Sequence, residues 1–150
     1  MNASGQILAR VLIGRSPRLM KLTPATGCSA HCLVSSSLAM TGKFVQDPDF
    51  PGECLPGGSM YNLSSATVTI TSETGAPIPN VKVKGRFLDD YWTNHPVTGT
   101  TNAAGIVTWK YKGPCGVGAV AFLVEKASHG TRTFDRTRGT LTAYVIPGSK

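Results

Sequence analysis

Apolar and polar residues alternate along several short stretches of the chain, as expected for β-strands with one buried face. Residues 66–71 are the clearest example, because an apolar residue precedes a threonine three times in succession. The apolar members of this stretch fit one pleated face, and threonine is itself enriched in strands. The pattern predicts a half-buried strand here.

Residues 81–88 alternate in the same way and combine an apolar face with a basic one. The inward face would carry Val81, Val83 and Phe87, and the outward face Lys82, Lys84 and Arg86. Gly85 falls on the inward face, which predicts a bulge or a close approach of another group.

Six further short strands are predicted, at residues 33–44, 97–101, 106–111, 119–124, 131–134 and 141–146. The fourth of these is apolar on both faces, which indicates a central strand covered on each side. In residues 106–111 the alternation places Trp109 in the core together with Val107 and Tyr111. No convincing helical period follows residue 27. Seven or eight short antiparallel strands predict an all-β sandwich.

The composition agrees with many strands joined by turns, since the 150 residues include 17 glycines and 10 prolines. This length suits one domain, and no run of about 18 apolar residues exists that would form a membrane-spanning helix. Residues 28–150 are interpreted as the sandwich domain and residues 1–27 as an extended arm or linker.

The arm is basic and contains no acidic residue, since the first acidic residue of the chain is Asp47. It resembles an organellar transit peptide more than a secretory signal, because Arg10 interrupts its apolar stretch. An extended arm can also add a strand to the sheet of a neighbouring subunit. Its apolar anchors would then be Ile7, Leu8, Val11, Leu12 and Ile13.

Four cysteines, an even number, permit complete pairing in three alternative connectivities: Cys28, Cys32, Cys54 and Cys115. Cys28 and Cys32 flank His31 at close spacing, which also raises a metal site. Zinc sites usually show two close pairs, and only one is present here. We therefore expect disulfides, no metal, and an extracellular or cell-surface location.

The net charge of +7 attracts anionic partners such as nucleic acid, acidic polysaccharide, anionic lipid or an acidic protein, although it also serves solubility alone. Lys82, Lys84 and Arg86 form the candidate face for such a partner. The same charges would equally protect a strand edge from unwanted pairing. Nucleic acid is not expected, because no aromatic residues are interleaved with these charges.

Residues 89–95 form a predicted loop with the best small-molecule candidates: Asp89, Asp90, Tyr91, Trp92 and His95. Aromatic rings can stack on sugars while carboxylates accept their hydroxyl groups. Adjacent acids also suit a calcium ion, but the sequence offers too few ligands, so a solvated loop is the simpler interpretation. Trp92 has an alternative structural role as a lid over the end of the sandwich.

The sequence contains no pattern of residues that indicates an enzyme. The histidines fall in predicted loops or turns, and no nucleophile elbow, metalloprotease motif or phosphate-binding loop is present. Neither a catalytic residue nor a cofactor is expected.

Three segments carry a family resemblance: residues 66–70 (Ala-Thr-Val-Thr-Ile), residues 75–83 (Gly-Ala-Pro-Ile-Pro-Asn-Val-Lys-Val) and residues 100–109 (Thr-Thr-Asn-Ala-Ala-Gly-Ile-Val-Thr-Trp). From residue 66 to about residue 134 the chain resembles bacterial Ig-like modules of the invasin/intimin type. It also resembles the Ig-like domains appended to secreted subtilisin-like proteases. The cysteines, the proline-rich stretch at 46–61 and the N-terminal segment depart from these families. A transthyretin-like sandwich is the nearest alternative fold.

The resemblance implies an Ig-like sandwich without catalytic activity. Such modules serve as spacers, adhesins, filament subunits and enzyme accessories. We expect a structural or adhesive role, such as a self-assembling surface filament or coat subunit that uses residues 1–27. The alternative is a carbohydrate-binding accessory domain of a secreted enzyme, so the expected partners are other protein subunits or a surface glycan.

Overall fold

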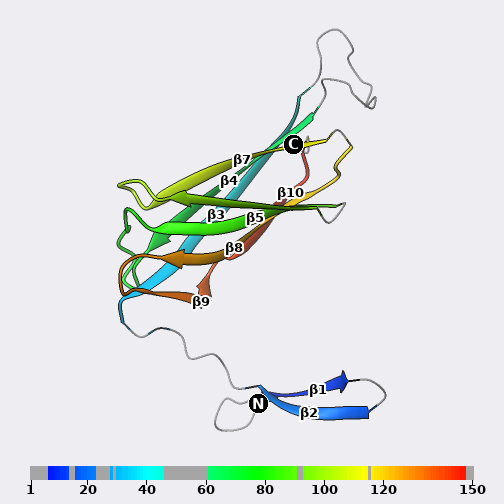
Figure 1. The fold of residues 1–150 in the computed structure, drawn as a ribbon, viewed down its shortest axis with the longest axis vertical. Helices are drawn as coiled ribbons and strands as arrows, with labels where there is room; N and C mark the ends of the chain where they lie inside the picture. The colour runs from blue at the N-terminus through cyan, green and yellow to red at the C-terminus, as the bar shows by residue number, and fades with distance from the viewer. Residues whose placement is uncertain are drawn as a thin grey trace.

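The computed structural model describes residues 28, 30–45, 61–90, 93–114 and 116–147, and the backbone of residues 7–13 and 16–22. Regular structure in these ranges consists of strands alone (Figure 1). They contain no helix with the length and hydropathy that a membrane crossing requires.

Eight strands form two four-stranded sheets that face each other, which confirms the predicted β-sandwich. The first, called here the β5 sheet, has the order β10-β8-β5-β6, and the second, the β4 sheet, has the order β7-β4-β3-β9. The strands are β3 (Cys32–Val45), β4 (Tyr61–Thr71), β5 (Lys82–Asp89), β6 (Asn94–Thr100), β7 (Ile106–Pro114), β8 (Val120–Ser128), β9 (Thr133–Gly139) and β10 (Thr142–Val145).

One pair of strands departs from the expected antiparallel arrangement. β3 and β9 run parallel, with Cys32 opposite Thr133 and Leu33 opposite Phe134. Parallel neighbours cannot be joined by a tight hairpin. Here β9 directly follows β8 of the opposite sheet, so the chain crosses between the sheets before it lies beside β3.

The core fills the space between the sheets with the apolar residues of the alternating strands. Its largest fully buried side chains include Phe87, Phe122, Leu33, Ile70 and Val68. The ring of Phe122 meets that of Phe87 edge to face at 4.8 Å and stacks on Trp109 at 5.2 Å. The prediction that Trp109 faces the core is therefore confirmed.

Gly85 occupies a site with no room for a side chain. The β5–β8 register shifts between Lys84 and Gly85, and a Cβ atom at Gly85 would lie 2.5 Å from the Phe122 ring. Both the bulge and the close approach that the sequence predicted are present.

The N-terminal segment contains a hairpin. β1 (Ile7–Ile13) and β2 (Ser16–Leu22) pair antiparallel, from Ile7 opposite Leu22 to Ile13 opposite Ser16. The sequence predicts one extended arm or linker here and gives no indication of β2. All five proposed apolar anchors belong to β1, which is already paired along one of its edges.

Candidate functional site

The predicted loop at residues 89–95 is shorter than expected. β5 continues to Asp89 and β6 begins at Asn94, with Phe87 opposite His95 in the ladder. Asp89 and His95 therefore belong to strands, contrary to the prediction. Tyr91 and Trp92 lie outside the described residues.

Asp89 points inward and links the two sheets. Its Oδ2 accepts a hydrogen bond of 3.0 Å from the hydroxyl of Tyr111, which lies on β7 of the β4 sheet. Its Oδ1 accepts one of 2.9 Å from the backbone N–H of Thr93. His95 Nε2 lies 3.6 Å from Oδ2, and the His95 and Tyr111 rings are 4.5 Å apart. A carboxylate can occupy this inward strand position because polar partners surround it.

The ionisation of this cluster follows from its burial and hydrogen bonds. Burial raises the pKa of Asp89, but the Thr93 N–H, the Tyr111 hydroxyl and His95 outweigh it and hold the pKa below its ordinary value. Burial, followed by the hydrogen bond to Asp89, raises the pKa of Tyr111 to about 12. Tyr111 thus keeps its proton at neutral pH and acts as a donor.

These contacts change the role assigned to Asp89. The residue is only 6 % exposed and both of its carboxylate oxygens hold parts of the sandwich together. Asp89 therefore joins the two sheets at this end of the sandwich.

Asp90 is exposed and lies on the outside of the same end. Its Oδ2 accepts a 2.7 Å hydrogen bond from the backbone N–H of Gly118, which connects the end of β5 to the turn before β8. The contact anchors Asp90 beside the outer surface of the β5 sheet.

A shallow hollow of about 310 Å³ opens at this point, lined by Leu88, Asp89, Asp90, Ala119, Ala121 and Tyr144. Tyr144 lies on β10, directly opposite Ala121 of β8, and is 74 % exposed. Tyr144 was not among the predicted site residues, although the alternation of residues 141–146 makes its side chain point away from those of Ala143 and Val145. We call Leu88, Asp90, Ala119, Ala121 and Tyr144 the Tyr144 surface.

β8 explains why this surface is apolar. The strand is central, as predicted, with β5 and β10 on its two sides. Its inward residues are buried, but the outward Ala121 and Leu123 are only half-buried. The prediction that both faces are covered was wrong, because in the described structure no layer of the sandwich packs over the outer face of the β5 sheet.

The predicted basic face is present on β5, but one of its charges is paired. Lys82 and Lys84 are exposed, whereas the Arg86 guanidinium lies 2.7 Å from the Glu125 carboxylate of the neighbouring β8. Lys110 and Lys112 do not extend this face, because they belong to β7 in the other sheet.

The close cysteine pair forms a disulfide. Cys28 and Cys32 are bonded, with their Cα atoms 5.7 Å apart, which confirms one pairing among those that the sequence allowed. Cys54 and Cys115 lie outside the described residues. Within the described ranges, no group of three or more histidine, cysteine and acidic side chains is placed to hold a metal ion.

Neither a protein-family model, nor a curated protein, nor a solved structure gives a significant match to this chain.

Proposed function

We propose that this chain is a non-catalytic, extracellular adhesive module of Ig-like type that binds a neutral glycan through the Tyr144 surface. The observation that carries the proposal is the 74 % exposure of Tyr144 on an open sheet face, beside a half-buried apolar floor. Exposed apolar patches rimmed by polar residues mark binding surfaces, and here the Tyr144 ring and the apolar floor line one hollow beside Asp90.

The Tyr144 surface has the two chemical features that a sugar ring requires. The tyrosine ring and the apolar floor of Leu88, Ala119 and Ala121 can pack against the C–H face of a pyranose. Asp90 uses Oδ2 for Gly118, which leaves Oδ1 to accept a hydrogen bond from a sugar hydroxyl. The bond to Gly118 also fixes the carboxylate in advance, which lowers the entropic cost of binding.

The shape of the hollow limits the mode of binding. It is shallow and open, and its volume of about 310 Å³ falls at the lower end of the range for ligand pockets. Such a surface suits the side of a glycan chain rather than an enclosed small molecule. The Cys28–Cys32 disulfide supports the extracellular location, since such bonds persist in oxidising compartments.

Binding to a panel of neutral oligosaccharides, followed by calorimetry on the best of them, tests the proposal. Tyr144→Ala should weaken the affinity by about tenfold, since aromatic contacts contribute about 1 kcal/mol or more. The thermal midpoint should stay unchanged, because the ring is mostly exposed. Ile146→Ala, which removes another exposed apolar side chain nearby in sequence, serves as the matched control and should bind normally. Absence of binding to any neutral glycan, or equal binding by Tyr144→Ala, would overturn the proposal.

Self-assembly through residues 1–27 is a second candidate role, favoured by the β1–β2 hairpin. An isolated two-stranded hairpin is marginally stable in water, so it would gain by joining the sheet of another subunit. Sedimentation velocity on non-reduced protein, with and without residues 1–27, tests this role. Large species that disappear with the segment are expected, and an unchanged distribution contradicts it.

A further inference from the structure

The outer face of the β4 sheet carries a regular array of hydroxyl and ammonium groups. Residues paired across strands share a face, so the ladder defines rows that run from β3 through β4 to β7. Thr67 lies between Ala39 and Thr108, and the next rows contain Thr41, Ser65 and Lys110, then Lys43, Leu63 and Lys112. The inward neighbours of these residues on β4 are buried, which places the rows on the outside.

Three lysines occupy two adjacent rows of this array. Lys43 and Lys112 flank Leu63 and are two strands apart, about 10 Å at the usual spacing of neighbouring strands. Lys110 lies two residues from Lys112 along β7, about 7 Å away. All three are exposed. We call Lys43, Lys110 and Lys112 the lysine triangle.

None of the acidic residues that the structure describes lies beside the lysine triangle. Asp89 and Glu125 belong to the β5 sheet, and Asp90 follows β5. Asp135 is buried on β9, and Glu73, beyond the far end of β4, accepts hydrogen bonds from the His31 and Cys32 backbone. Asp47, Asp49 and Glu53 lie outside the described residues. The β5 sheet differs, because Glu125 there neutralises Arg86 at 2.7 Å.

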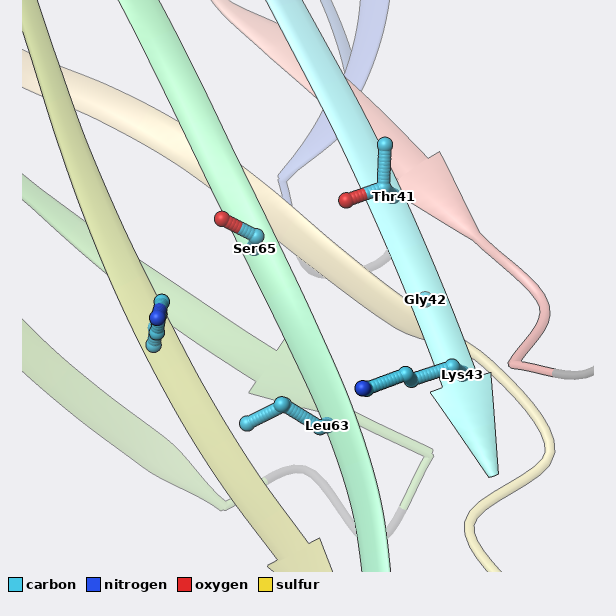
Figure 2. Close-up of a pocket in the computed structure, with 6 residues that line it drawn as sticks. Thr41, Gly42, Lys43, Leu63 and Ser65 are labelled. Carbon is cyan, nitrogen blue, oxygen red and sulfur yellow. The ribbon is translucent and has the colours of Figure 1, made fainter. Parts of the chain in front are cut away.

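A hollow of about 170 Å³ lies within the array and is lined by Thr41, Gly42, Lys43, Leu63, Ser65 and Lys110. Figure 2 shows the Lys43 side chain extending from β3 toward β4, which carries Leu63, with Thr41 and Ser65 in the next row of the same two strands. Farther along the sheet, the hydroxyls of Thr67 and Thr108 are 3.0 Å apart. The surface thus combines positive charge with an extended line of hydroxyl groups.

We propose that this outer face of the β4 sheet binds an acidic polysaccharide. The lysine triangle would contact the anionic groups, and the threonine and serine hydroxyls would exchange hydrogen bonds with the sugar hydroxyls. This surface lies on the opposite sheet from the Tyr144 surface and does not depend on the function proposed above.

The three rows carry no aromatic ring, which argues against a single-stranded nucleic acid as the partner. Proteins that bind such strands stack bases on exposed aromatic faces. The ring of Tyr61 lies one row beyond Lys43, and the Lys112 ammonium covers it at 3.9 Å from its centroid. A polysaccharide needs no stacking and uses the hydroxyl array directly.

Binding of the full chain to dextran sulfate, with uncharged dextran as the matched probe, tests the proposal. Dextran sulfate should bind with an affinity that falls as salt is added, and dextran should not bind. The triple variant Lys43→Gln/Lys110→Gln/Lys112→Gln should bind dextran sulfate about tenfold more weakly, since each exposed ionic contact contributes a factor of a few. Unchanged circular dichroism and thermal midpoint would show that the variant is folded.

The control removes the same charge from the other sheet, as Lys82→Gln/Lys84→Gln/Lys126→Gln, and should retain most of the affinity. Equal losses in both triple variants would overturn the proposal, because net charge alone would then explain binding. A larger loss in the control would move the site to the β5 sheet. Tighter binding to a single-stranded oligonucleotide or to anionic lipid vesicles than to dextran sulfate would contradict the polysaccharide as partner.

Discussion

Replacing Tyr111 by phenylalanine removes the oxygen atom that joins the two sheets at Asp89. The hydroxyl donates to a carboxylate with 6 % exposure at 3.0 Å. A hydrogen bond to a buried charged group is worth about 1.5–3 kcal/mol, and its loss leaves the carboxylate without one of its donors. We therefore expect Tyr111→Phe to lower the free energy of unfolding by about 2 kcal/mol at neutral pH.

The same substitution should change the response to alkali. The pKa of Tyr111 is higher in the folded than in the unfolded chain, so its contribution is complete below about pH 10. The contribution is lost as the pH rises from about 10 to about 12. Tyr111→Phe has no such group to titrate, so the difference in stability between the two proteins should shrink over that interval.

Urea unfolding followed by tryptophan fluorescence, at neutral pH and then in steps to pH 12, measures both effects. Tyr144→Phe is the control, because it removes the hydroxyl of a tyrosine that is 74 % exposed and should change the free energy of unfolding by less than about 0.5 kcal/mol. The link between the sheets would be refuted if Tyr111→Phe matched this control. A constant stability difference from pH 8 to 12 would refute the assigned pKa.

Three further outcomes are expected. The pKa values of Glu73, Asp89 and Asp135 are all lowered in the folded chain, so stability should be complete above the ordinary carboxyl range and fall as the pH drops below about 4; circular dichroism that shows no loss at pH 2–3 would contradict this. Gly85→Ala places a methyl group 2.5 Å from the Phe122 ring and should cost about 1–3 kcal/mol in urea unfolding, part of which Phe122→Leu in the same chain should restore. Because the Cys28–Cys32 disulfide spans a sequence separation of only 4, Cys28→Ser/Cys32→Ser should cost at most about 2 kcal/mol in urea unfolding and leave the sandwich folded; loss of the native circular dichroism spectrum would contradict this.

The strand pattern could be predicted where burial and alternation coincide. Residues 81–88 are the best case, since Val83 and Phe87 are buried and Lys82 and Lys84 are exposed, as the alternation indicates. Even the exception at Gly85 was informative, because a glycine on an apolar face implies that another group occupies the space of its side chain.

The prediction failed where inward positions are polar. β4 begins at Tyr61, five residues earlier than the alternation indicates, because its inward residues there are Asn62 and Ser64. The Asn62 amide donates to the carbonyls of Pro114 and Val117, which satisfies it inside the sandwich. Asp89 is the same case at the candidate site. Its partner Tyr111 lies 22 residues away on the opposite sheet, and no local pattern encodes that pairing.

The candidate site was located in part. The sequence directed attention to the end of β5, and the structure places the hollow with Asp90 there. Tyr144 could not be predicted as a site residue, because the alternation in its strand does not show whether the outer face of the sheet is covered. The row of Lys43, Leu63 and Lys112 could not be predicted either. Its members come from three strands, and their register is known only from the assembled sheet.

The parallel pairing of β3 with β9 has a consequence for how the chain reaches its fold during synthesis. β3 is the first strand of the sandwich to leave the ribosome, and its partner Thr133 follows 101 residues after Cys32. Contacts between such distant segments require a large loss of chain entropy before they form, which slows folding. Until β9 emerges, the edge of β3 at Cys32 and Leu33 has open main-chain groups and an apolar side chain that could pair with another nascent chain. The yield of folded protein in the cell should therefore be at least as sensitive to substitutions in the last 20 residues or so of the sandwich as to substitutions in the loops near the candidate site.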